Sequence, residues 1–228
     1  MSKKRQQAIE EIINLTLNFS NQVLNQLHKL QELIDSPGFD ISDEQFSELR
    51  KREKEFDKLE IKVSDDIIKC IVLHQPVASD LRTLIACYRI SINLERIGDL
   101  AMNIVKFILK IKDRNVIKIL PGVINKMLSS SIVMVRKAIL SFSNNDKELA
   151  LWTLKMDDEI DEMNQNLLKK TISKSDFDKE TRKIMEGFIQ LSSIISNVER
   201  IGDHATNIAE SSIYAIDGLD LRHTKLPG

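Results

Sequence analysis

The chain has 228 residues, of which 42% are apolar, 29% charged and 5% aromatic, and its formal net charge is −1. This composition is typical of a soluble, helix-rich globular protein and argues against a β-sandwich or barrel. The balanced charge provides no overall basic field for nucleic acid, although it leaves local basic patches open, so we expect no bulk nucleic-acid binding. Because no stretch approaches 18 uncharged apolar residues and no signal peptide begins the chain, we expect a cytoplasmic protein that meets membranes only through partners.

Two helices are predicted before residue 75. Apolar residues three or four apart mark the first helix over 9–34, and the segment Ser36-Pro37-Gly38 ends it. Ser42 followed by Gln45 resembles a capping box. It opens a second helix, whose inward residues continue as far as Ile71.

A third helix follows the break at Gln75-Pro76. Pro76 suits the first helical position because its missing N–H is not needed there. Asp80 then suits the positive end of the helix dipole. The apolar pattern continues to about Lys112.

The second half repeats this plan. A fourth helix is predicted to start near Pro121, and Asn145 with Glu148 three residues later is a capping signal for a fifth. The polar stretch 171–179 is a connection. The sixth helix ends before Gly218.

One motif occurs twice in the chain. The sequence ERIGDLAMNI at 95–104 returns 104 residues later as ERIGDHATNI at 199–208, altered at only two positions. Two copies of one unit therefore fill the protein. We predict an all-α fold of two similar three-helix bundles, residues 1–113 and 114–228.

Acidic side chains follow the same repeat. Each motif places Glu, Asp and Asn four apart on one helical face, and a second acidic pair precedes each motif. A hairpin of the second and third helices puts Glu53 and Asp99 both roughly 33–35 Å from the turn, at about 1.5 Å per residue. Four carboxylates are then expected to meet in each half: Glu53, Asp57, Glu95 and Asp99 in the first, and Asp157, Asp161, Glu199 and Asp203 in the second.

Converging carboxylates repel one another unless protons or cations neutralise them. Carboxylate oxygens are suitable ligands for Mg, Ca, Mn, Fe and, less often, Zn. The pattern therefore predicts metal sites. The Glu-x-x-His pair of most di-iron bundles is absent from both acidic motifs.

Two readings of the third helix remain open. Glu95 and Asp99 continue the spacing of Leu81, Ile85, Tyr88 and Ile92, so they could occupy core positions. A parallel row of apolar or small residues could instead form the buried seam: Leu84, Cys87, Ser91, Leu94 and Gly98. The carboxylates would then lie on a solvated flank, and Arg96 and Arg200 would form ordinary surface ion pairs.

Other residues carry weaker signals. Gly98 and Gly202 lie mid-helix, where glycine costs roughly 0.5–1 kcal/mol relative to alanine, so we expect close approach of a neighbouring element. His204, one residue off the acidic face, is expected at the rim. Cys70 and Cys87 lie in apolar segments and are expected to be buried, reduced thiols. No pattern nominates a nucleophile.

Three segments together resemble the PhoU family of bacterial phosphate-signalling proteins: QPVASDLR at 75–82, ERIGDLAMNI at 95–104 and ERIGDHATNIAE at 199–210. The resemblance implies multinuclear metal sites at the eight carboxylates, with Asn103 and Asn207 as supporting polar groups. It leaves the metal open among Fe, Zn, Mn and Mg. Asp157 replaces the longer Glu53, which could change the number of ions.

The resemblance also implies a function. Members of the family are non-enzymatic negative regulators of phosphate uptake and phosphate-starvation signalling. They act between the ATPase subunit of a phosphate ABC transporter and a membrane sensor histidine kinase, and we expect a homodimer. The second half has no counterpart of 75–82, so contacts of that segment should be asymmetric. The alternatives are a carboxylate-bridged metalloenzyme, for which no general base is evident, and a plain helical adaptor without metal.

Overall fold

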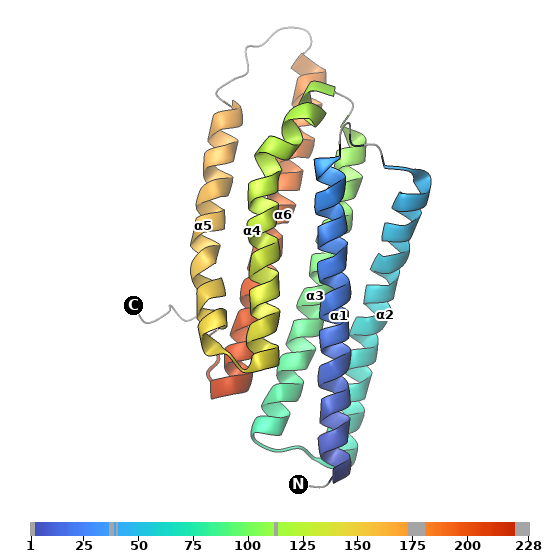
Figure 1. Cartoon of the computed structure of the whole chain (residues 1–228), viewed down its shortest axis with the longest axis vertical. Coiled ribbons are helices and arrows are strands. Elements are labelled where there is room, and N and C mark those ends of the chain that lie inside the picture. Colours follow the sequence, from blue (N-terminus) through green and yellow to red (C-terminus); the bar gives the residue numbers. More distant parts are fainter. Residues whose placement is uncertain (1–2, 37–38, 40, 112–113, 173–180, 222–228) are drawn as a thin grey trace.

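A computed structural model describes residues 3–36, 39, 41–111, 114–172 and 181–221. Within these ranges the protein is all-α, with no strand (Figure 1). Its helices are α1 (Lys3–Asp35), α2 (Asp43–His74), α3 (Ser79–Lys110), α4 (Arg114–Asn144), α5 (Lys147–Ile172) and α6 (Thr181–Asp217). None of these helices combines the length and hydropathy of a membrane span. The all-α prediction is confirmed.

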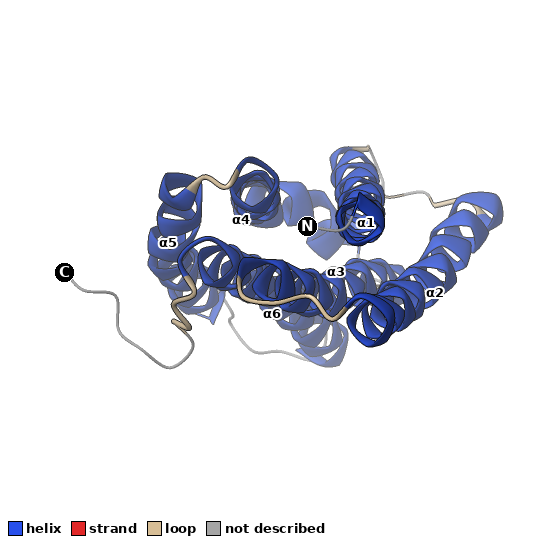
Figure 2. Ribbon diagram, turned by 90° about the horizontal axis from the view of Figure 1, so that it is seen from below, coloured by secondary structure: helices blue, strands red, loops and turns tan. Residues whose placement is uncertain are grey.

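The helices pack as two bundles of three. Helices α1, α2 and α3 contact one another, as do α4, α5 and α6, and the pairs α3–α6 and α1–α4 join the two sets. Successive helices run in opposite directions (Figure 1). Seen along the helices, α2, α3, α6 and α5 form one layer, while α1 and α4 cover one face of it (Figure 2). Among the described helices, none covers the face of α2 and α3 that lies away from α1.

Burial patterns explain why α3 is central and α2 peripheral. In α2 the buried residues are confined to one narrow row: Leu49, Phe56, Val63, Ile67 and Cys70. In α3 the buried residues extend round most of the helix, including Leu84, Ala86, Cys87, Ile90, Ile97, Met102 and Ile104. Burying one large apolar side chain stabilises a fold by about 1.5–3 kcal/mol. Contacts of α3 with α1, α2 and α6 therefore contribute much of the stability.

The ends of the first three helices only partly follow the sequence signals. Helix α1 ends at Asp35 as predicted; Pro37 and Gly38 lie outside the described residues. The capping box of α2 is confirmed, since Ser42 Oγ accepts from Gln45 N at 3.2 Å and Gln45 Oε1 accepts from Ser42 N at 2.9 Å.

The start of α3 was predicted wrongly. Gln75 adopts a left-handed conformation with φ 46°, and its N–H donates to the carbonyl of Ile71. This cap ends α2 and leaves Pro76 in the connection, so α3 begins at Ser79. Asp80 does lie in the first turn, where it pairs with Arg5 of α1 at 3.4 Å.

Two predictions in the second half were also wrong. Helix α4 begins at Arg114, so Pro121 lies inside it. A proline removes one backbone donor and bends a helix, but it does not have to end it. Asp146 caps α5, since its Oδ1 accepts from the backbone of Glu148 and Leu149, whereas Asn145 is left-handed with φ 52°. Helix α6 ends before Gly218 as predicted, and residues 173–180 of the predicted connection lie outside the described residues.

Candidate metal centre

Helices α2 and α3 approach closely at one point. Phe56 of α2, 1% exposed, lies against Gly98 of α3. A Cβ added to Gly98 would come within 3.0 Å of Phe56 Cε2 and nearer still to Cδ2. The prediction that this mid-helix glycine marks a close approach is therefore confirmed. Asp57 directly follows Phe56, and Asp99 directly follows Gly98. The contact between Phe56 and Gly98 therefore holds the two carboxylates at the same height along the paired helices.

Three of the predicted ligands come together beside this contact. Each of three residues contributes one carboxylate oxygen, and these three oxygens lie within 4.8 Å of one another: Asp57, Glu95 and Asp99. Glu95 and Asp99 are half-buried, and Asp57 is exposed. We call these three residues the acidic triad. Glu53, one helical turn before Asp57 on α2, is not part of this group, so the predicted set of four carboxylates is only partly brought together.

The surroundings of the acidic triad favour a proton or a cation. Burial, together with the charge of Asp99, raises the pKa of Glu95 to about 7, against the opposing effect of Arg96 and with a smaller contribution from Asp57. Arg96 Nε lies 3.5 Å from Glu95 Oε2, and its NH1 lies 4.0 Å from Asp99 Oδ2. The arginine side chain is 57% exposed, so solvent screens this pairing.

The spacing of the acidic triad suits one divalent ion. Oxygen ligands at about 2.0–2.4 Å from a cation lie at most about 4–5 Å from one another. Oxygens within 4.8 Å of one another can therefore reach a common ion with shifts of a few tenths of an ångström. Such an ion would neutralise the repulsion and connect α2 to α3.

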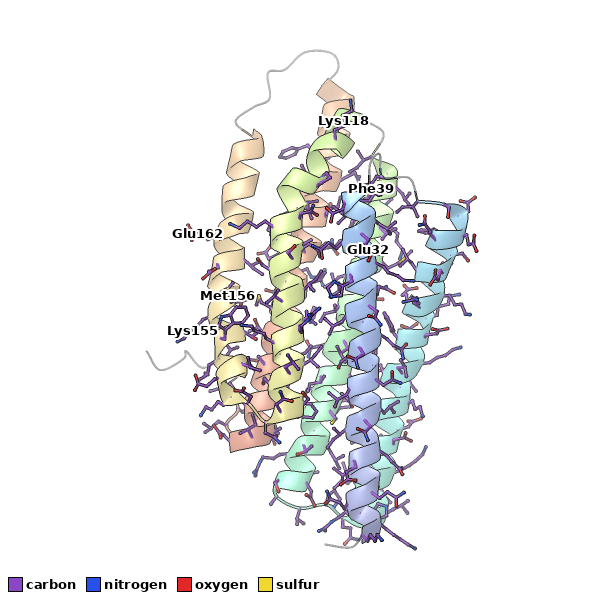
Figure 3. All side chains as sticks on the ribbon, viewed as in Figure 1. Glu32, Phe39, Lys118, Lys155, Met156 and Glu162 are labelled. Carbon is purple, nitrogen blue, oxygen red and sulfur yellow. The ribbon has the colours of Figure 1, made fainter. Side chains whose placement is uncertain are left out.

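The second half is described less completely. Asp157 is half-buried on α5, the helix on which Figure 3 labels Lys155, Met156 and Glu162. A Cβ added to Gly202 of α6 would lie 3.9 Å from Asp157 Oδ1 and 3.4 Å from Ile160 Cδ1. Asp157 therefore faces α6 close to the second motif. The side chain of Asp161 lies outside the described residues, so a second four-carboxylate group stays a prediction.

The supporting residues and the remaining acids of the second motif lie at different depths. Glu199 is half-buried and Asp203 is exposed. Asn103 is half-buried, while Asn207 is exposed and its backbone carbonyl accepts from Ser211 Oγ at 2.8 Å. Their proposed role beside metal ions stays a prediction.

The choice between the two readings of α3 is settled by burial. The row that includes Leu84, Cys87 and Leu94 is completely buried, whereas Leu81 and Tyr88 are 37% and 39% exposed. The second of the two readings is therefore the correct one, and Leu84, Cys87 and Leu94 lie in the buried seam. Glu95 and Asp99 continue a row that is only partly buried, since Ile85 and Ile92 are half-buried and Leu81 and Tyr88 are exposed.

A polar contact between the two halves was not predicted. His204 Nδ1 of α6 lies 2.8 Å from Asn93 Oδ1 of α3. Burial, followed by the charges of Arg200 and Arg96, lowers the pKa of His204 to about 4, so this histidine is neutral at physiological pH. The charges of both motif arginines therefore act on this contact. Nothing in the sequence around Asn93 identified it, because the contact depends on how the two halves pack.

Comparisons with known proteins agree with this geometry. The sequence model described as the PhoU domain matches the chain twice, over residues 16–108 and 124–212. A protein of Zymomonas mobilis named phosphate-specific transport system accessory protein PhoU homolog is 34% identical over 175 residues, which are 75% of this chain and 71% of that protein. A homolog of the same name from Clostridium acetobutylicum is 26% identical and spans 92% of this chain and 93% of that protein.

A solved structure supports the same fold. The crystal structure of PhoU from Pseudomonas aeruginosa superimposes with a TM-score of 0.78 at 23% identity, covering 94% of this chain and 99% of that chain. Because the domain match recurs in both halves and covers most of the chain, the protein belongs to the PhoU family.

Proposed function

We propose that this chain is a regulator of phosphate uptake that acts as an accessory protein of a phosphate-specific transport system. The observation that carries this proposal is the double match to the PhoU domain, together with the accessory-protein names of relatives that align with most of the chain. These names describe an accessory role and not an enzyme. Asp57, Glu95 and Asp99 suit cation binding, and no group among the described residues around them suggests a nucleophile.

The finer proposal is a cytoplasmic negative regulator of phosphate-starvation signalling. It would act as a homodimer between the ATPase subunit of a phosphate ABC transporter and a sensor histidine kinase. Family membership supports this role, because the relatives are named accessory proteins of a phosphate-specific transport system. Its genetic test is deletion of the gene followed by assay of phosphate-starvation genes in phosphate-rich medium. Starvation genes that stay silent in the deletion strain would contradict the regulatory role.

Metal binding is proposed for the acidic triad. Asp57, Glu95 and Asp99 would supply the first ligands, and Glu53 would need a side-chain movement to join them. The bound cation would supply charge neutralisation and a rigid connection between α2 and α3. The raised pKa of Glu95 and the like charges around it support the proposal. The corresponding acids Asp157, Asp161, Glu199 and Asp203 are proposed as a second site by the repeat.

Elemental analysis of the purified protein tests the metal site. The variant Asp57→Asn/Glu95→Gln/Asp99→Asn should lose bound Fe, Zn or Mn that the parent chain retains after gel filtration. A control variant removes three charges elsewhere, at residues that are all exposed: Glu10→Gln, Asp65→Asn and Glu159→Gln. This control should keep the parental metal content. Equal and near-zero metal in all three proteins would reject the site.

A further inference from the structure

Exposed large apolar side chains gather on the α2–α3 hairpin. On α2, Ile61 and Ile68 are each 56% exposed and Val72 is 67% exposed. The row continues through Val77 in the connection to Leu81 and Tyr88 on α3. We call these six residues the apolar strip. Large exposed apolar patches mark interaction sites on soluble proteins.

The apolar strip ends at the acidic triad. On α2 the exposed residues follow Asp57 at steps of four, seven and four, which keeps them on one flank of the helix. On α3, Leu81, Tyr88, Glu95 and Asp99 are separated by seven, seven and four residues and share one face in the same way. Because α2 and α3 are antiparallel neighbours, the two rows run side by side and reach the triad together.

The two rows have the spacing that a third helix needs in order to pack against both. Apolar residues at steps of four and seven on two adjacent helices are the pattern into which a third helix packs. From Asp57 to Val72 the surface extends for about 22 Å at 1.5 Å per residue. A partner helix of about 15 residues would cover it.

The second half keeps the apolar strip only in part. At the positions 104 residues later, Ile61, Val72, Val77 and Tyr88 are replaced by Gln165, Asp176, Thr181 and Ser192, whereas Ile68 and Leu81 correspond to Ile172 and Met185. The repeat has kept its acidic motif in both halves but the complete row of apolar residues in only one. The strip is therefore not a requirement of the fold, which supports a binding role specific to the α2–α3 hairpin.

We propose that the apolar strip and the acidic triad form a docking site for one amphipathic helix of a partner protein. The apolar face of that helix covers the strip, and a lysine or arginine at one end pairs with the triad. Charge complementarity identifies this occupant, because three carboxylates meet there and Arg96 is the one cation within 4.0 Å of them among the described residues. The proposal goes beyond the proposed function, which names no contact surface.

A cation in the acidic triad and the partner's basic group would neutralise the same carboxylates. Each is therefore expected to weaken binding of the other. The apolar part of the interaction does not depend on the metal. The docking site can thus be tested in chelator, independently of the metal proposal.

A synthetic peptide tests the docking site on the full chain. The probe is a labelled helical peptide of about 16 residues with leucines at helical spacing and two arginines at one end; a second version carries two glutamates there. Fluorescence anisotropy should show binding of the arginine peptide at least tenfold tighter than that of the glutamate peptide. Ile68→Lys should weaken the arginine peptide at least tenfold.

Ile189→Lys is the matched control. Ile189 is the same residue type with the same 56% exposure on a helix, but it lies on α6, outside the apolar strip. This variant should bind within twofold of the parent, and far-UV circular dichroism should show that both variants are folded. Asp57→Asn/Asp99→Asn should remove the preference for arginine over glutamate.

Three results would overturn the proposal. The first is that the arginine peptide does not bind, and the second is that Ile68→Lys and Ile189→Lys lower the affinity for the peptide equally. The third is that the parent chain forms a dimer, which Ile68→Lys dissociates but which the peptide does not dissociate. The last result would assign the apolar strip to a second copy of this chain. None of them changes the metal content or the deletion phenotype, so failure here is distinguishable from failure of the proposed function.

Discussion

The two repeated glycines provide a sharp test of the packing between α2 and α3. Alanine at either mid-helix position gains about 0.5–1 kcal/mol of helix propensity. At Gly98 the new methyl group would overlap the ring of Phe56, which is 1% exposed and packs against Phe19 at 5.6 Å between ring centroids. Because the ring cannot move aside, overpacking of this kind costs about 1–3 kcal/mol.

The net effects should have opposite signs. We expect Gly98→Ala to lower the free energy of unfolding by about 1–2 kcal/mol, since overpacking exceeds the propensity gain. At Gly202 the nearest atom is the flexible end of Ile160, at 3.4 Å, which is ordinary contact. Gly202→Ala should therefore keep most of the gain and raise the free energy of unfolding by about 0.5 kcal/mol.

Urea and thermal denaturation followed by circular dichroism measure both variants. For a chain of this size, 1 kcal/mol corresponds to a Tm shift of about 2–4 °C. The two Tm values should therefore differ by about 4–8 °C. Equal shifts in the same direction would show that Phe56 does not pack against Gly98 as described, and the reasoning about the close approach would fail.

Three further outcomes follow from the same residues. The pKa of Glu95 is raised from 4.5 to about 7, so between these pH values the folded state binds more protons than the unfolded state. The free energy of unfolding in chelator should therefore fall as pH rises through this interval. In Glu95→Gln, the urea midpoint should depend less on pH. Added Mn²⁺ should raise Tm more at pH 8, where Glu95 is ionised, than at pH 6, where the ion must displace its proton. Asp99→Asn should abolish this difference. Burial raises the pKa of Cys87 on α3 to about 12 and also raises that of Cys70 on α2, so neither thiol should react with a disulfide reagent before the chain unfolds. Rapid labelling of either cysteine in the native protein would contradict the packing of the helix that carries it.

The sequence was sufficient for the architecture. Apolar residues three or four apart predicted each helix, and the repeated motif predicted the two bundles. Counting residues on either side of Gln75-Pro76 placed Glu53 at the level of Asp99, because antiparallel helices of equal rise meet at predictable levels. The structure instead brings Asp57, one turn further along α2, to Glu95 and Asp99. These inferences depend on local geometry, which the sequence determines directly.

Inferences that depended on tertiary packing were less successful. Two neighbouring rows on α3 are both apolar, and only the contacts with α1, α2 and α6 determine which one is buried. The bond between Asn93 and His204 requires the register between the halves, which no spacing within one half reveals. Pro121 and Asn145 were assigned by propensity, which the rest of the structure overrides.

The pairing of α3 with α6 makes the halves depend on each other. The helices that carry the two motifs are also the helices that join the bundles, so either half in isolation would expose the side of its central helix that the other half now covers. A single repeat would need another molecule to cover that side. The tandem arrangement makes this association intramolecular, so the two halves do not need to carry identical surface residues.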